Sequence, residues 1–180
     1  PPARPGAAGQ GVFGERWPVD VYVLPAVWLE PDAEDRLAPG QTADTATGPG
    51  IGLRGAVGNR DQSIGLLYHT ASLDGRGTAS DSDVDTHALY LDFDVSVPLR
   101  NEPEGFFVHA AVGLGMARLD YRGTRFDDTT TGAANLRFDL EYQPSRRWSL
   151  LAGVGGFAWG HPGETEAYGT FIELGARLVF

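Results

Sequence analysis

Residues 170–180 read TFIELGARLVF and form the carboxyl end of the sequence. Every second residue is apolar, and the residues between them include Glu173 and Arg177. Because successive side chains of a strand point to opposite faces, this period of two predicts a strand with one continuous apolar face. A tilted strand needs about 9–11 residues to cross a bilayer. The stretch therefore predicts a membrane-crossing strand, whose apolar face holds Ile172, Leu174, Ala176, Leu178 and Phe180.

The same alternation recurs along the chain and predicts seven further strands. In the first of them the apolar face is expected to hold Val19, Val21, Val23, Val27 and Leu29, with Asp20 and Tyr22 opposite. A period of two that is sustained over whole segments is typical of half-exposed strands. The seven segments are residues 17–30, 50–57, 63–72, 89–97, 106–117, 134–142 and 148–155.

The connections between these segments alternate in length. Polar stretches at 31–49, 73–83 and 122–131 alternate with tight turns at 58–61, 98–104 and 143–146, and 160–164 is intermediate. Long outer loops, short periplasmic turns and aromatic girdles are typical of transmembrane barrels. Aromatic residues lie near the expected strand ends: Trp17, Tyr22, Trp28, Tyr68, Phe106, Tyr121, Tyr142, Trp148, Trp159, Tyr168 and Phe180.

These patterns predict an all-β, eight-stranded antiparallel up-and-down transmembrane β-barrel over residues 17–180. Residues 1–16 are rich in Pro, Gly and Ala and cannot bury enough apolar surface to fold alone. We expect them to be a periplasmic amino-terminal tail, either a flexible leader or a segment docked on the barrel or a partner. A soluble lipocalin-like barrel or sandwich, with the apolar face inward and the charges outward, is the alternative.

Composition narrows the function classes. The net charge of −10 argues against nucleic acid as a partner. The absence of Cys excludes thiolate chemistry and Cys-based zinc sites, and fits an oxidising or envelope compartment. No apolar run approaches the roughly 18 residues that indicate a transmembrane helix.

With its strand and loop rhythm and its terminal Phe180, the chain resembles the small eight-stranded outer-membrane proteins. This group includes the OmpA transmembrane domain, OmpX, OmpW and the opacity proteins. The resemblance implies location in a Gram-negative outer membrane, contact with its lipid and lipopolysaccharide, and insertion by the barrel-assembly machinery, with Phe180 as part of the assembly signal. It implies no single activity, because fold does not fix function.

The polar faces of the strands are expected to meet inside the barrel. An eight-stranded barrel is just wide enough for side chains to fill it, and unpaired charges there would be costly. We therefore expect a paired network, with a narrow polar path for small solutes or protons as the alternative. Gly113, Gly115, Gly153 and Gly155 leave space that Phe157, Phe171, the tail or a ligand would fill. The expected lumen network comprises Arg54, Asp92, Asp94, His109, Arg137, Asp139, Glu141, Glu173 and Arg177.

Candidates for catalysis or metal binding lie in the polar stretches. A His–Asp–Ser grouping is conceivable at the fourth strand, but no His-x-Ser pair occurs on a strand, and we expect no catalytic residue. The alternating Asp81, Asp83 and Asp85 lack the Gly and Glu of an EF-hand loop, so we expect neither metal site nor cofactor. The residues in question are Ser80, Ser82, Asp83, Asp85, His87 and His161, with Asp127 and Asp128 as a second acidic spot.

The function that we predict from sequence is non-enzymatic. It is a structural or anchoring role in the outer membrane, or that of a subunit in a larger envelope assembly joined through residues 1–16. The alternatives are a narrow channel for small or hydrophobic solutes and a lipid A-modifying enzyme.

Overall fold

The computed structural model describes residues 17–31, 45–59, 61–75, 83–99, 105–122, 128–161 and 164–180. The expected tail, residues 1–16, lies outside the described residues. The strands are β1 (Pro18–Pro31), β2 (Ala46–Gly58), β3 (Gln62–Gly75), β4 (Asp83–Pro98), β5 (Gly105–Arg122), β6 (Thr129–Ser145), β7 (Trp148–His161) and β8 (Glu164–Val179).

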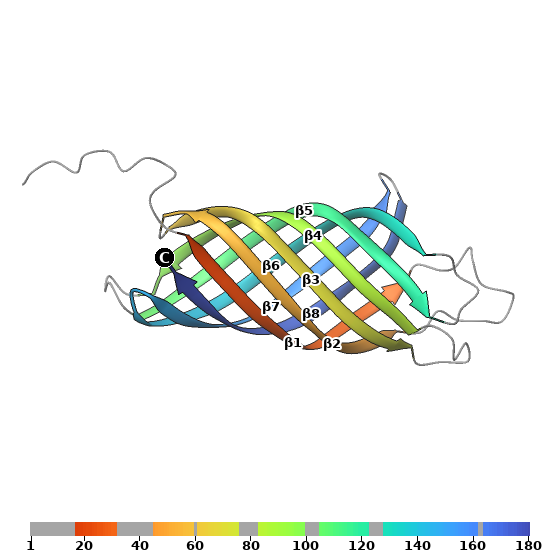
Figure 1. Ribbon diagram of the computed structural model, residues 1–180, viewed down its shortest axis with the longest axis horizontal. Coiled ribbons are helices and arrows are strands. Elements are labelled where there is room, and N and C mark those ends of the chain that lie inside the picture. Colours follow the sequence, from red (N-terminus) through yellow and green to blue (C-terminus); the bar gives the residue numbers. More distant parts are fainter. Residues whose placement is uncertain are drawn as a thin grey trace, which may run out of the picture.

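Each strand pairs antiparallel with the next, and β1 pairs with β8, so the sheet closes on itself (Figure 1). The predicted fold class is confirmed. Pro18 at the start of β1 lies opposite Val179 at the end of β8, which places both strand ends at one end of the barrel. In the described ranges, no helix has the length and apolar character needed to cross a membrane.

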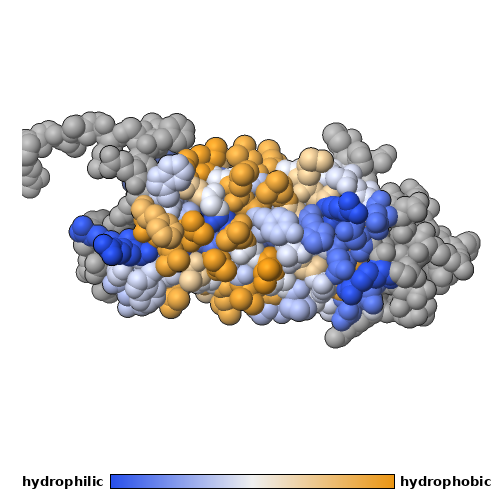
Figure 2. Space-filling model, in the orientation of Figure 1, coloured by the Kyte–Doolittle hydropathy of each residue, from blue (hydrophilic) through white to orange (hydrophobic). Residues whose placement is uncertain are grey.

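The outer face of the barrel is apolar. Leu91 and Leu114 are 58% and 66% exposed, and Figure 2 shows apolar side chains around the middle of the barrel with hydrophilic ones toward the ends. Within this apolar belt the charged side chains of the same strands, Asp92, Asp94 and His109, point inward. The soluble alternative requires the opposite arrangement and is wrong, whereas apolar-out and polar-in is the pattern of a transmembrane barrel.

The strands are longer than their apolar alternation suggests. Residues 73–75 belong to β3 and residues 129–131 to β6, so the predicted polar loops are shorter than expected. The connection expected at 160–164 shrinks to residues 162 and 163. Backbone pairing continues beyond the lipid-facing belt with polar side chains, and alternation of apolar residues marks only the belt itself.

One strand reverses its faces. Between Leu24 and Val27, β1 carries one residue more than either neighbouring strand, as a β-bulge. Val21 and Val23 therefore point outward as predicted, whereas Val27 and Leu29 are buried. The prediction that these valines and Leu29 share one face is wrong beyond the bulge.

Two of the expected girdle aromatics also point inward. Tyr22 is 1% exposed and Trp159 is 3% exposed, so both belong to the lumen. The other described aromatics of the set are exposed on the outer face, and all but Tyr68, which lies in the middle of β3, are near strand ends: Trp17, Trp28, Tyr68, Phe106, Tyr142, Trp148, Tyr168 and Phe180. The side chain of Tyr121 lies outside the described set.

Candidate functional site

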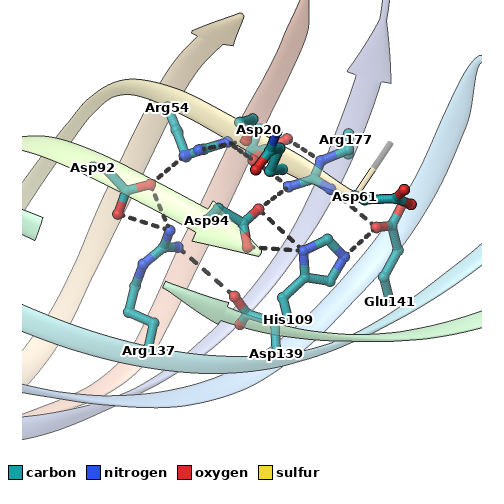
Figure 3. A network of polar contacts seen from close by, with 12 residues as sticks. Asp20, Arg54, Asp61, Asp92, Asp94, His109, Arg137, Asp139, Glu141 and Arg177 are labelled. Carbon is teal, nitrogen blue, oxygen red and sulfur yellow. Dashed lines mark hydrogen bonds and ion pairs between the residues drawn. The ribbon is translucent and has the colours of Figure 1, made fainter. Parts of the chain in front are cut away.

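The half of the lumen near the chain termini holds an ionic layer (Figure 3). Asp92 on β4 lies at its centre and contacts two guanidinium groups. Arg54 Nε donates to its Oδ2 over 2.5 Å, and Arg137 Nη2 lies 3.2 Å from both of its oxygens. Arg54 also donates to Ser63 Oγ over 2.8 Å and lies 3.5 Å from Asp20. All of these groups are buried, so each charge depends on its partners rather than on water.

Arg137, on β6, connects the layer to β8 and to a second residue of β1. Its Nη1 donates to Glu173 Oε1 on β8 over 3.3 Å and to the Tyr22 hydroxyl on β1 over 3.2 Å. The Tyr22 hydroxyl in turn donates to Asp20 over 3.1 Å. Asp139 lies 3.8 Å from the same guanidinium. The hydroxyl thus links a cation to a carboxylate that the cation does not reach directly.

His109 bridges two carboxylates. Its Nδ1 lies 3.0 Å from Asp94 Oδ2, and its Nε2 lies 2.5 Å from Glu141 Oε2. Both nitrogens face acceptors, so both must carry hydrogen for the two bonds to form, and the ring is then an imidazolium. Arg177 Nη1 reaches the same Glu141 oxygen over 3.0 Å.

The structure brings all nine sequence-predicted lumen residues to the inner face, and each contacts a charge of opposite sign. Sequence reasoning placed Asp20 and Tyr22 on the polar face of the first strand but left them, like Ser63, out of the expected network. Asp20 lies between outward valines, so the alternation was sufficient to include it. Ser63 carries no such signal, because its role depends on the register that places it beside Arg54.

Above the ionic layer, toward the loop end of the strands, the lumen is mainly apolar, and its buried polar side chains in the described ranges include His69, Thr86, Thr131 and Asn135. Phe157 stacks on Trp159 with ring centroids 4.3 Å apart, and Trp159 Nε1 donates to the Tyr90 hydroxyl over 2.9 Å. Sequence analysis did not foresee this layer. Its members also include Leu24, Val27, Leu29, Leu67, Leu73, Val84, Ala88, Ala117, Leu119, Ala167 and Phe171.

Neighbouring side chains fill the space beside the inward glycines. A Cβ built on Gly155 would overlap the Phe171 ring, and one on Gly153 would overlap the Asp139 carboxylate. A hollow of about 30 Å³ remains at the terminal end, lined in part by Asp94, Glu141 and Arg177. This volume suits a water molecule or two.

The described residues among those considered for catalysis, His87 and Asp85 in particular, lie on the outer face near the loop end. His87 Nδ1 contacts the Tyr68 hydroxyl over 2.8 Å and Thr70 Oγ1 over 3.1 Å, and Ser72 Oγ donates to Asp85 over 2.6 Å. The hydrogen bonds of the His87 ring therefore go to neither a serine side chain nor the Asp85 carboxylate. Asp81, Ser80, Ser82 and Asp127 fall outside the described residues, as does the side chain of His161.

The same face carries a band of exposed ion pairs, which we call the outer polar band. Arg118 contacts Asp120 over 2.5 Å and Asp128 over 3.6 Å, and Arg122 contacts Asp85 over 3.1 Å. Across the described ranges, no group of three or more His, Asp or Glu side chains is arranged to hold a metal ion.

Phe180 lies at the junction of the first and last strands. Its backbone pairs with Trp17 through two hydrogen bonds of 3.4 Å, and its side chain is 74% exposed. The terminal aromatic therefore continues the β8 edge and leaves its ring accessible.

Solved structures place this fold among known barrels. Neisserial surface protein A matches with a TM-score of 0.66 and 9% identity, over 91% of this chain and 96% of the other. The amino-terminal barrel domain of Pseudomonas aeruginosa OprF matches with a TM-score of 0.52 and 14% identity, over 91% and 97%. Ail, the attachment invasion locus protein of Yersinia pestis, solved with the heparin analogue sucrose octasulfate, matches with a TM-score of 0.51 and 11% identity, over 92% and 98%.

No protein-family model and no curated protein sequence matches the chain. The structural likeness, which spans nine-tenths of the chain in each case, therefore concerns the fold. The chain has the closed eight-stranded barrel fold of the small outer-membrane proteins.

Proposed function

We propose that this chain is a structural or anchoring barrel of a Gram-negative outer membrane. The observation that carries the proposal is the filled lumen beneath an apolar outer face. The ionic layer occupies the terminal half of the lumen, and the apolar layer occupies the loop half. A barrel filled in this way offers its outer surface and its ends, rather than its interior, for contact with other molecules.

A narrow channel is the first alternative, and the apolar layer argues against it. Ions that cross the lumen would have to leave water beside Phe157, Trp159 and Phe171, where polar partners are few. In planar bilayers we expect no conductance steps above background, with a large porin as positive control. Steps that change in Asp92→Ala or Arg177→Ala would replace the structural proposal with a channel.

The outer polar band supports contact with lipopolysaccharide. Its arginine and aspartate side chains lie toward the loop ends of β4 and β5, beyond the apolar belt. In an outer-membrane barrel this is the depth of the lipid phosphates and sugars of the outer leaflet. Exposed Arg118 and Arg122 suit phosphate oxygens directly, and the carboxylates suit a bridging divalent cation.

Residues 1–16 are the proposed periplasmic connector to a partner or a second copy. The support is their position directly before β1, whose start lies at the same end as the chain terminus. The test is native mass after gentle detergent extraction of the full chain and of a variant lacking residues 1–16. We expect the full chain to run with a partner and the shortened barrel to run alone; identical masses for both would remove the connector role.

A further inference from the structure

Among the described residues, the lumen contains more acid than base. Six carboxyl groups face three guanidinium groups and the imidazole of His109. The second inward imidazole, that of His69, packs against the rings of Tyr90 and Phe171 and pairs with no carboxylate of the described ranges, so it is counted as neutral. Even with His109 charged, two negative charges lack a cationic counterpart. An uncompensated charge in a barrel interior is costly, so protons or a bound cation must reduce the imbalance. The carboxyl groups are Asp20, Asp92, Asp94, Asp139, Glu141 and Glu173, and the guanidinium groups are Arg54, Arg137 and Arg177.

Most of these carboxyl groups are satisfied by donors. Asp92 takes donors from two arginines on its two oxygens, and Glu141 receives His109 and Arg177. Two oxygens have no donor: Oδ1 of Asp139 and Oε2 of Glu173. Both side chains are buried, at 5% and 0% exposure. A carboxylate can only accept, so these two oxygens mark where a hydrogen is missing.

The strand register brings the two unpartnered oxygens together. Gly153 on β7 lies directly opposite Asp139 on β6 and directly opposite Glu173 on β8. A Cβ at Gly153 would overlap Asp139 Oδ1, so this oxygen lies over the glycine, toward β8. The Asp139 and Glu173 carboxyl groups are within hydrogen-bond reach of each other. The missing side chain of Gly153 is what lets two acids from strands that are not neighbours meet.

We infer that Asp139 and Glu173 share one proton, as a carboxylic acid that donates to a carboxylate across Gly153. The proton comes from water during folding, supplies the missing donor for both orphan oxygens and removes one of the two excess charges. Arg137 Nη1, which lies beside both groups, faces the remaining carboxylate charge. Two carboxylates at one buried site cannot both ionise cheaply, which is the reason for the shared proton.

The proton couples the barrel to pH. Since the folded chain holds a proton that the unfolded chain releases, the free energy of unfolding falls as pH rises from neutral to alkaline. Other groups around the pair titrate as well, and the comparison with variants must separate them. They are Arg137 and Glu141 on β6, Arg177 on β8, Asp20 and Tyr22 on β1, Arg54 on β2, His69 on β3, Asp92 and Asp94 on β4, and His109 on β5.

Infrared spectroscopy of the detergent-solubilised full chain tests the proposal at neutral pH. We expect a protonated-carboxyl C=O band that shifts in D2O, and its loss in both Asp139→Asn and Glu173→Gln. Gly153→Ala should weaken or shift the band because the new Cβ displaces Asp139. Asp85→Asn, at an exposed carboxylate on Ser72 and Arg122, and Gly55→Ala, at a site with no atom within 4 Å, should leave it unchanged.

Three results would overturn the proposal. The first is a wild-type chain without the band, which needs no variant to fold. The second is a band that persists in both isosteric variants. The third is a metal ion retained at one per chain after extensive dialysis, because a cation would then supply the charge. A supporting readout is the pH slope of stability, which should be shallower between neutral and alkaline pH in Glu173→Gln than in the wild type.

Discussion

Arg177 donates two parallel hydrogen bonds to Asp20, from Nε to Oδ1 over 2.7 Å and from Nη2 to Oδ2 over 2.9 Å. The two residues are direct cross-strand partners on β8 and β1, the pair of strands that closes the barrel. Two parallel bonds fix both the distance and the relative orientation of these strands. The ionic layer therefore holds together the first and last strands of the chain.

Replacing Arg177 should weaken this closure. In Arg177→Met, Asp20 loses both bonds while buried, and Glu141 loses one donor; removing one partner of a buried pair costs roughly 3–5 kcal/mol. Urea unfolding in detergent, followed by the mobility of folded and unfolded bands, measures the change. Arg147→Met, in the exposed turn before β7, is the control and should be near neutral. An equally small effect for Arg177→Met would show that the two Arg177–Asp20 hydrogen bonds do not stabilise the closure of the barrel.

The apolar layer contains one hydrogen bond whose contribution can be isolated. Trp159 donates to Tyr90, and both are buried. Tyr90→Phe leaves the indole N–H unsatisfied, so we expect a loss of about 1–3 kcal/mol in the free energy of unfolding. A double-mutant cycle with Trp159→Phe should recover part of that loss, since the second change removes the orphan donor. Strict additivity of the two losses would mean that this bond contributes nothing.

The loss of stability caused by a charge on the outer face shows whether that face meets lipid or water. Leu114 is 66% exposed in the middle of β5, and in a membrane Leu114→Arg should cost roughly 2–4 kcal/mol, against roughly 0–1 for Thr130→Arg near the loop end of β6. Folding in lipid vesicles, titrated with urea, measures both. If the two arginines cost the same small amount, the outer face meets water and the membrane location is wrong.

Phe180 provides a test of assembly in cells that is separate from stability. Its ring is exposed, so Phe180→Ser removes little packing, and refolding of the purified chain in detergent should be nearly unchanged. We expect a lower yield of folded barrel in the outer membrane of living cells, because the terminal aromatic is the proposed assembly signal. Trp17→Ser, at the opposite strand of the same junction, is the matched control. Equal yields for all three chains would remove the signal role.

His87 tests the enzymatic alternative. Its ring contacts Tyr68 and Thr70 on the outer face, and we expect His87→Ala to keep the fold and to change no chemistry. Mass spectrometry of lipid A from cells that carry the wild-type chain, His87→Ala or no chain should give the same species. A modification present with the wild type and absent with His87→Ala would establish an enzyme.

The fold was predictable because two surroundings act on every strand. An apolar outer face and a lumen filled by side chains impose a period of two within the strands, which the bulge in β1 interrupts, and this period can be recognised without knowledge of partners. The ends of the strands were less predictable. At Leu67 the inward residue is apolar like its outward neighbours Leu66 and Tyr68, and at Leu119 the inward residue is apolar while its outward neighbours are charged. The apolar-out, polar-in alternation therefore fades or inverts where the lumen changes from ionic to apolar.

The sequence was sufficient to predict which charged residues face the lumen, but not which of them contact one another. Charges such as Arg54 and Asp92 stand out between outward apolar residues, so their inward direction could be read from the sequence. Which carboxylate meets which guanidinium depends on register, and register depends on the bulge in β1 and on strand ends that composition does not mark. The pairing of Asp139 with Glu173 across Gly153 is of this second kind.

The bulge between Leu24 and Val27 gives β1 a constraint on length. The extra residue changes the parity of the inward-facing positions, from even numbers before the bulge to odd numbers after it. Asp20 therefore faces the ionic layer and Leu29 faces the apolar layer of the same lumen. A deletion of one residue at Pro25 or Ala26 would remove this change of parity, and one of the two segments would then turn its lumen-facing side chains outward. Insertions and deletions of one residue should therefore be harmful here even though every residue type in the segment is ordinary. Insertions or deletions of two residues keep the parity of β1 and should be tolerated better than changes of one residue.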